Sequence, residues 1–234
     1  KVSEGRVLAL VDAVLQQPIF EGLAQWTVDE GTPQGAVISP LLANLYLDPL
    51  DRAVAAAGYE IVRYADDFVI LCRTAEDATQ ALALVQRWTE AAGLRLHPEK
   101  THLVDMPQPG GFDFLGYHFE RGHRWPRAKS LRKLKDAVRQ KTRRTNGYSL
   151  ACIIADVNRT LVGWLEYFKH SHYTFRDLDK WIRMRLRSIL RKRMRRRGRG
   201  RGCDHQHWPV AFFTAQGLFS LAHAHAAFRQ SFTR

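Results

Sequence analysis

Two adjacent carboxylates, Asp66 and Asp67, stand in the middle of an apolar run, RYADDFVILC at residues 63–72. An unpaired charge among buried apolar residues costs several kcal/mol, so we expect a positively charged partner for the two aspartates. A divalent cation is the obvious candidate, because Mg²⁺ prefers a few carboxylates combined with substrate phosphates. Two such metals about 4 Å apart can activate a 3′-hydroxyl and stabilise a leaving pyrophosphate, which is nucleotidyl transfer. The other interpretation is an ordinary solvated Asp-Asp turn, and the dipeptide by itself does not exclude it.

The residues around the pair predict a tight β-hairpin. Residues 59–64 and 68–72 are rich in Ile, Val, Tyr and Phe, as strands are, and they are separated by two or three residues around Ala65. The turn lacks the Gly or Asn-Gly that such connections usually carry. Where a turn lacks its preferred residues, a functional constraint is the expected reason.

The first half of the chain predicts alternating helices and strands. A helix should begin at Ser39, a good N-cap, with Pro40 at its first position. Pro49 should kink or restart it, with Asp48 as a second cap. Apolar spacing and the breakers between segments further predict helices over 3–17 and 75–92, strands on both sides of a His97-Pro98 turn within 94–105, and a strand over 111–120.

After about residue 125 the pattern becomes helical. We expect three amphipathic helices that form a small bundle: residues 129–145, a helix capped by Ser149, and a helix that starts at a capping box of Thr174 and Asp177. The basic, Gly-spaced segment 191–202 reads as a flexible arm, and the apolar segment 208–228 should pack back as a short helical segment.

Charge divides the chain into two unlike parts. Residues 1–120 hold 8 Lys and Arg against 17 Asp and Glu, a net charge of −9, whereas residues 121–234 hold 28 against 6, a net charge of +22. An acidic part joined to a strongly basic part is typical of a body with a polyanion-binding partner domain, so nucleic acid is the expected ligand.

Composition excludes several classes of protein. With 45% hydrophobic residues the chain is globular rather than disordered. It has no run of 18 apolar residues and no secretory signal, and its three cysteines are widely spaced. We therefore expect a cytoplasmic protein of bacterial type, with no membrane partner. The histidines near Cys203 have no standard zinc spacing, so a zinc site is not expected.

Four motifs occur in an order that is familiar from reverse transcriptases: GTPQGAVISPLLANLYL at 31–47, YADD at 64–67, LHPEKT at 96–101 and FLGYHF at 114–119. With LVGWLEYF at 161–168 and the helix that follows, nearly the entire chain resembles the group II intron-encoded reverse transcriptase/maturase family. The resemblance implies an α+β fold: a partial polymerase palm over 1–123, an antiparallel sheet with helices, followed by an all-helical thumb or maturase domain over 124–202 that includes the basic arm. Residues 203–234 would form a C-terminal helical tail.

The resemblance also implies roles for individual residues. Asp66 and Asp67 match the catalytic carboxylates that bind two Mg²⁺, which Mn²⁺ could replace, and Lys100 matches a catalytic lysine near the triphosphate. The residues that would contact the nucleotide and template are Gly31, Gln34, Gly35, Ser39, Pro40, Asn44, Tyr64 and Ala65. Those of the hairpin that grips the primer are Phe114, Leu115, Gly116 and Tyr117.

RNA binding is expected from the basic helix that follows this hairpin. The favoured phosphate contacts are Arg132, Lys133, Lys135, Arg139, Lys141, Arg143 and Arg144. The aromatic residues Trp164, Tyr167, Phe168 and Trp181 could stack on bases, but their spacing fits a helical core better. The run Arg191–Arg201 is either a second RNA contact or a solvated arm.

These observations favour an RNA-directed DNA polymerase of group II intron type that also binds intron RNA and assists splicing. Its partners would be intron or template RNA, a DNA primer and dNTPs. The alternatives are an RNA-binding maturase without synthesis, or a defence- or CRISPR-linked reverse transcriptase. In the family a further metal-binding aspartate lies on an upstream strand, and neither Asp12 nor Asp29 resembles it. We therefore expect a truncated chain that alone is weak or inactive, with an upstream fragment as a possible partner that completes the site.

Overall fold

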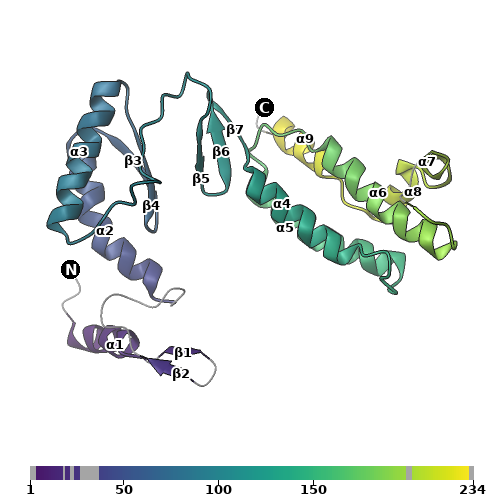
Figure 1. Ribbon diagram of the computed structural model, residues 1–234, viewed down its shortest axis with the longest axis horizontal. Helices are drawn as coiled ribbons and strands as arrows, with labels where there is room; N and C mark the ends of the chain where they lie inside the picture. The colour runs from purple at the N-terminus through teal and green to yellow at the C-terminus, as the bar shows by residue number, and fades with distance from the viewer. Residues whose placement is uncertain (1–3, 18, 22–23, 27–36, 199–201, 232–234) are drawn as a thin grey trace. The chain divides into compact units, whose positions relative to one another are not determined.

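The computed structural model describes residues 4–17, 19–21, 24–26, 37–198 and 202–231 (Figure 1). The chain divides into two compact units, 1–103 and 104–234. The predicted boundary at 123/124 lies later than this, because the strands that follow residue 111 form a sheet bonded to the helices of the second unit.

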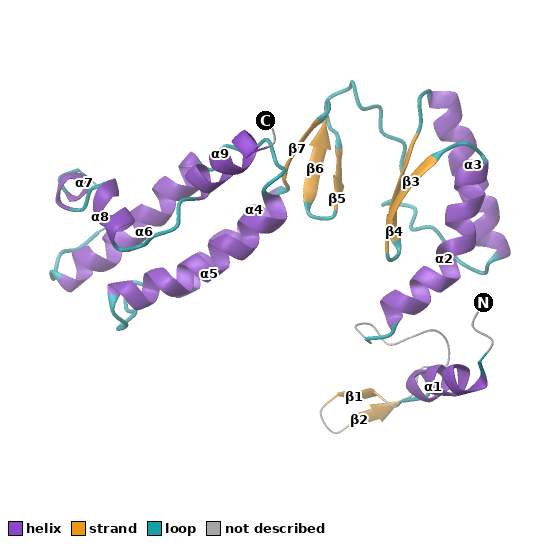
Figure 2. Cartoon of the chain, turned by 180° about the vertical axis from the view of Figure 1, so that it is seen from behind, coloured by secondary structure: helices purple, strands orange, loops and turns teal. Residues whose placement is uncertain are grey.

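The core of the first unit lies between one hairpin and two helices. The elements in order are α1 (Gly5–Leu15), β1 (Ile19–Glu21), β2 (Ala24–Trp26), α2 (Ser39–Ala56), β3 (Glu60–Tyr64), β4 (Asp67–Leu71) and α3 (Ala75–Ala91). Leu50, Val54 and Val85 are buried where α2 and α3 pack together against Phe68 and Ile70 of the hairpin. Figure 2 shows α2 and α3 beside strands β3 and β4. This burial of apolar surface holds the hairpin against the two helices.

Helix α2 differs from its prediction in two respects. It begins at Ser39 with Ile38 as the cap residue, so Ser39 is the first helical residue rather than the cap. Pro49 also does not restart the helix, because α2 continues through it, and Asp48 forms an ion pair with Arg52 at 2.9 Å instead of capping a second helix. A proline removes one backbone hydrogen bond, and the buried Leu50 that follows shows that packing outweighs this loss.

The segment between the two units contains turns where strands were predicted. Lys100 and Thr101 both donate backbone hydrogen bonds to the carbonyl of His97, at 3.1 and 3.0 Å, so the predicted turn is present. No strand flanks it between residues 94 and 111, all of which are described. The prediction of strands within 94–105 was wrong. A strand needs a neighbouring strand to pair with, and a short apolar run does not show whether one is available.

The second unit joins a three-stranded antiparallel sheet to a helical bundle. The sheet order is β5-β6-β7. The elements are β5 (Phe112–Phe114), β6 (Tyr117–Glu120), β7 (His123–Pro126), α4 (Ala128–Lys141), α5 (Leu150–Phe168), α6 (Arg176–Arg193), α7 (Asp204–His207), α8 (Val210–Ala215) and α9 (Leu221–Ser231). The single strand predicted over 111–120 is therefore a hairpin, turned by Leu115 and Gly116.

The helical bundle has one core that extends to the last helix. Ser149 caps α5 as predicted, accepting a hydrogen bond from the Cys152 amide at 3.2 Å. The capping box predicted at Thr174 was wrong, because α6 starts one residue after Phe175, which is its cap. The core also includes the apolar residues of the tail, Trp208, Phe213 and Leu221. The segment predicted to pack back on the chain thus does so, because residues 203–231 bury their apolar side chains in the bundle.

The basic run at 191–202 is partly helical. Arg191 lies in the last turn of α6, and its guanidinium contacts the buried Asp204 at 2.8 Å and the carbonyl of Arg197 at 2.8 Å. This part of the run is therefore not a flexible arm. No described helix is both long and apolar enough to cross a membrane.

Candidate functional site

The β3–β4 hairpin has one face toward the core and one toward solvent. Ile61, Phe68 and Ile70 pack against α2 and α3. Tyr64 lies on the opposite face and is 68% exposed. Because side chains alternate along a strand, Asp67, which pairs with Tyr64 in the register, also lies on the exposed face.

Asp66 lies in the turn itself. Ala65 and Asp66 are the two central residues, and Ala65 has φ +54°. Positive φ at the first central position alone is typical of a type II′ turn, where Gly is the usual residue. Both carboxylates are exposed. The aspartates are therefore not the buried charges expected from the sequence, because alternation buries the apolar neighbours and leaves Asp66 and Asp67 in water.

A single guanidinium links this turn to helix α2. Arg63 donates from Nε and Nη2 to the carboxylate of Asp51, at 2.6 to 3.1 Å. Its Nη1 donates to Asn44 Oδ1 at 2.9 Å and to the carbonyl of Ala65 at 2.8 Å. The Arg63 side chain is only 9% exposed, and its hydrogen bonds to Asp51 raise the pKa of the guanidinium. Neither Arg63 nor Asp51 was among the site residues predicted from the sequence.

The other nucleotide-site residues predicted from the sequence are placed differently. Lys100 is exposed in the 97–101 turn and makes no hydrogen bond or ion pair to Asp66 or Asp67 within the described chain. Asn44 is exposed on α2 and accepts a hydrogen bond from Arg63 at 2.9 Å. Gly31, Gln34 and Gly35 lie outside the described residues.

The donor set at the turn suits magnesium. Mg²⁺ is commonly bound through one or two carboxylates while it keeps several waters and gains phosphate oxygens from a substrate. Asp66 and Asp67 offer hard oxygen ligands on an exposed turn. The described ranges contain no group of three or more His, Cys, Asp or Glu side chains that could by itself hold a metal ion.

The second hairpin turn is attached to the helical bundle through its carbonyl groups. Leu115 and Gly116 have φ of +47° and +81°, the positive pair that a type I′ turn requires. The carbonyl of Leu115 accepts a hydrogen bond from the Tyr167 hydroxyl at 2.6 Å. The carbonyl of Gly116 accepts from the Ser130 hydroxyl at 2.9 Å and from the Arg127 amide at 3.0 Å.

Aromatic residues complete this attachment. Tyr117 donates its hydroxyl proton to the carbonyl of Tyr167, and its ring lies 4.9 Å from that of Phe168. Burial raises the pKa of Tyr117. Phe168 is in the core and Trp164 packs against it, as predicted, whereas Tyr167 is 54% exposed. The helical spacing could not show that Tyr167 contacts a strand turn about 50 residues earlier in the chain.

The cations of α4 and the residues after it fall into two groups. Arg132, Lys133, Arg139 and Arg143 are exposed, and Arg139 also pairs with Asp136 at 2.5 Å. The others are half-buried: Lys135, Lys141, which pairs with Asp156 at 2.7 Å, and Arg144, which donates to the carbonyl of Ser188 at 3.3 Å. The hydrogen bond from Lys141 lowers the pKa of Asp156.

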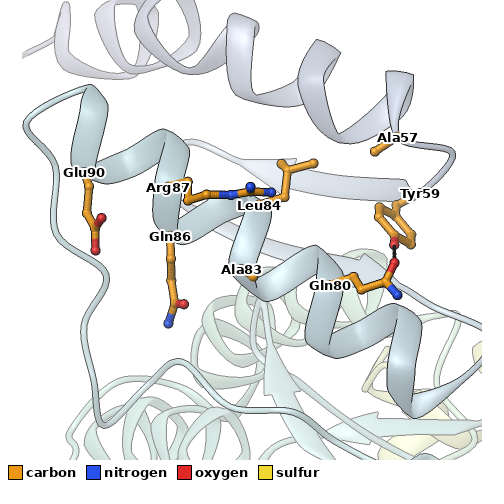
Figure 3. Close-up of a pocket in the computed structure, with 8 residues that line it drawn as sticks. All are labelled: Ala57, Tyr59, Gln80, Ala83, Leu84, Gln86, Arg87 and Glu90. Carbon is orange, nitrogen blue, oxygen red and sulfur yellow. Dashed lines mark hydrogen bonds between the residues drawn. The ribbon is translucent and has the colours of Figure 1, made fainter.

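A pocket in the first unit lies at the other end of β3 from the turn (Figure 3). Its lining residues are Ala57, Tyr59, Gln80, Ala83, Leu84, Gln86, Arg87 and Glu90. The Tyr59 hydroxyl donates to Gln80 across one side of it, at 3.4 Å. None of the predicted site residues lines this pocket, so it is separate from the carboxylate turn.

Two models of known protein families match the chain. Residues 8–119 match the family model described as reverse transcriptase (RNA-dependent DNA polymerase), and residues 131–208 match the group II intron maturase-specific domain. The chain belongs to the group II intron reverse transcriptase/maturase family. The carboxylate turn lies within the reverse transcriptase match, and α4 to α7 supply the maturase match. No curated protein matches the chain significantly.

Proposed function

We propose that Asp66 and Asp67 are the catalytic carboxylates of an RNA-directed DNA polymerase. The observation that carries the proposal is an exposed two-residue turn that presents both aspartates within the segment that matches reverse transcriptases. When bound, Mg²⁺ would activate the primer hydroxyl and stabilise the leaving pyrophosphate. Asp66 and Asp67 would hold this metal, and their exposure leaves room for water and phosphate ligands.

The proposal gives further residues supporting roles. The exposed ring of Tyr64 lies on the same face as Asp67 and is available to the primer end. The exposed Lys100 would neutralise charge on the triphosphate. The residues proposed to grip the primer are Phe114, Leu115, Gly116 and Tyr117, and those proposed to contact nucleotide or template are Gly31, Gln34, Gly35, Ser39, Pro40, Asn44 and Ala65.

The test is the double variant Asp66→Asn, Asp67→Asn in the whole product of the reading frame that encodes this chain. We expect cDNA synthesis on a primed RNA template to be abolished, while intron binding and splicing remain nearly intact. Asp48→Asn is the matched control, since Asp48 is an exposed aspartate of α2 that pairs with Arg52. Synthesis that survives in the double variant would show that the turn is not the polymerase site.

For the 234-residue chain by itself we propose weak or no polymerase activity. The resemblance to the family implies three metal-binding aspartates, and the turn supplies two of them. Steady incorporation of dNTPs by the purified chain on a primed RNA template would contradict this. Addition of a separately expressed upstream fragment should raise incorporation if such a fragment completes the site.

RNA binding by the second unit is the other half of the proposal. It is supported by the maturase match and by exposed cations on and just after α4. Replacing Arg132, Lys133 and Arg143 by Gln should weaken intron RNA binding, and each lost phosphate contact should reduce the salt slope of log K by about 0.7 to 1. A maturase without synthesis would require these cations but not Asp66 and Asp67, so the two sets of variants separate the two activities.

A further inference from the structure

Arg63 is unusual for its position in the hairpin. It lies on the core-facing side of β3 and β4, where the other strand residues are Ile61, Phe68 and Ile70. A charge in such a place is unfavourable unless it is paired and hydrogen-bonded. Arg63 meets this condition with a side chain that is 9% exposed and contacts Asp51, Asn44 and the backbone of the turn.

Helix α2 supplies the two side chains that hold the guanidinium. Asn44 and Asp51 are about two turns apart, so both lie on the face of α2 that meets the hairpin. Asp51 binds one edge of the guanidinium through Nε and Nη2, and Asn44 binds Nη1. The planar group therefore has one orientation, in which the remaining Nη1 proton reaches the carbonyl of Ala65.

The Ala65 carbonyl is the functionally important contact. Ala65 has φ +54°, a left-handed conformation that is unfavourable for a residue with a Cβ and persists where its surroundings enforce it. The following residues are Asp66 and Asp67. An ion pair that served stability alone would need Arg63 and Asp51 and no contact with the turn, and buried pairs of that kind are often replaceable by apolar residues.

We propose that Arg63 is a positioning residue for the carboxylate turn. Its guanidinium fixes the backbone at Ala65 and thereby the direction in which Asp66 and Asp67 present their carboxylates, while Asp51 and Asn44 hold the guanidinium. The proposal rests on the proposed function of Asp66 and Asp67, and it gives Asn44 a role in this network. Lysine cannot replace Arg63, because an ammonium lacks the planar fork that reaches three acceptors at once.

The first test is structural and uses the 234-residue chain. In Arg63→Lys, the NMR Cα and Cβ shifts of Ala65 should lose the values of a left-handed residue, and the amides of residues 64–68 should exchange faster. Mn²⁺ alone, added as the probe, should need about tenfold higher concentration to broaden these amides, as is typical when a group that orients metal ligands is lost. Arg52→Lys is the matched control, since Arg52 is an exposed arginine of α2 that pairs with Asp48, and it should change none of these signals.

The second test is kinetic and uses the whole product of the reading frame. Arg63→Lys should lower kcat for primer extension about 100-fold, as expected when reacting groups are displaced by about 1 Å. The KM for dNTP should change little, because Arg63 does not contact the substrate. A purely structural role would instead lower the amount of folded protein without altering the kcat of the folded fraction.

The outcomes separate this proposal from the one on which it rests. Asp66→Asn with Asp67→Asn should abolish synthesis and leave the Ala65 shifts unchanged, whereas Arg63→Lys should alter both. Unchanged Ala65 shifts and Mn²⁺ broadening in Arg63→Lys would overturn the positioning role. If Arg63→Lys fails to fold, Asn44→Ala decides the question: we expect a partial change at Ala65 with an unchanged melting temperature, and no change at Ala65 would overturn the proposal.

Discussion

The turn at Ala65–Asp66 and the turn at Leu115–Gly116 both join antiparallel strands through two residues, and both contain residues at positive φ. Their supports differ. At the first turn one buried guanidinium, itself held by helix α2, binds a single carbonyl. At the second, a hydroxyl from α4, a hydroxyl from α5 and a backbone amide bind two carbonyls.

The difference shows two ways to hold an unfavourable backbone conformation. A charge-assisted fork is strong and directional, but it depends on a complete ion pair, so the loss of one partner affects the whole network. Neutral hydrogen bonds each contribute about 1 kcal/mol, so the second turn should tolerate the loss of any one of them. The second arrangement also ties the proposed primer-gripping turn to the helices of the maturase domain.

Among the variants that compare the two turns, removal of Asp51 should change the free energy of unfolding most. Asp51→Ala leaves Arg63 mostly buried without its counter-ion, and breaking a buried pair in this way should lower the free energy of unfolding by about 3 kcal/mol. Urea unfolding of the 234-residue chain, followed by the fluorescence of Trp88 in the first unit, measures this. Asp48→Ala, which breaks an exposed pair of α2, should cost less than about 0.5 kcal/mol. If both variants lose the same free energy of unfolding, the Arg63 network stabilises the first unit no more than an exposed ion pair does.

Glycine substitution should distinguish the backbones of the two turns. Gly116→Ala places a Cβ at φ +81°, 3.3 Å from the Ser130 hydroxyl, and should destabilise the second unit by about 1 to 2 kcal/mol. Ala65→Gly relieves a left-handed alanine but increases the freedom of the unfolded chain, so the net change should stay within about 0.5 kcal/mol. Denaturant midpoints of the two variants give both values. A tolerant Gly116→Ala would show that the second turn adapts freely.

Loss of a single hydroxyl should have a moderate effect. Tyr167→Phe removes the hydrogen bond to the Leu115 carbonyl and should lower the free energy of unfolding by about 1 kcal/mol. Tyr148→Phe is the control, since Tyr148 is 71% exposed and its hydroxyl makes no hydrogen bond within the described chain. Thermal unfolding of both variants measures the difference. If Tyr167→Phe lowers the free energy of unfolding as much as Asp51→Ala does, then neutral hydrogen bonds hold the second turn as strongly as the charged network holds the first.

Alkaline pH should change the free energy of unfolding least, and only through Tyr117 at the second turn. Burial raises the pKa of Tyr117 above its ordinary value of 10.0, so the unfolded chain loses this proton first. The contribution of the protonated Tyr117 hydroxyl to the free energy of unfolding is present below pH 10.0 and is lost as pH rises through the folded-state pKa. Arg63 stays charged, because Asp51 raises its pKa. The difference in free energy of unfolding between the wild type and Tyr117→Phe should therefore shrink between neutral pH and about pH 11, whereas that between the wild type and Asp51→Ala should not.

Local patterns were sufficient for most elements. The helices at α1, α3, α4, α5 and α6 and the β3–β4 hairpin follow from apolar periodicity and breakers. The errors came where partners decide the outcome. Pro49 stays inside a helix because Leu47, Leu50 and Val54 are buried around it, and residues 94–105 form no strand because no neighbouring strand pairs with them. The apolar segment 208–228 packs back as predicted, with Phe213 and Leu221 in the bundle core.

The sequence by itself determined the family, the division into an acidic and a basic part, and the adjacent pair Asp66 and Asp67, because these depend on residue types and their order. Tertiary structure alone decided that both aspartates are exposed, that α2 holds Arg63 against their turn, and that Tyr167 reaches the second turn. The contacts of Arg63 with α2 and of Tyr167 with Leu115 join residues from 12 to 52 positions apart, and such pairings depend on packing in three dimensions, which local sequence patterns do not encode.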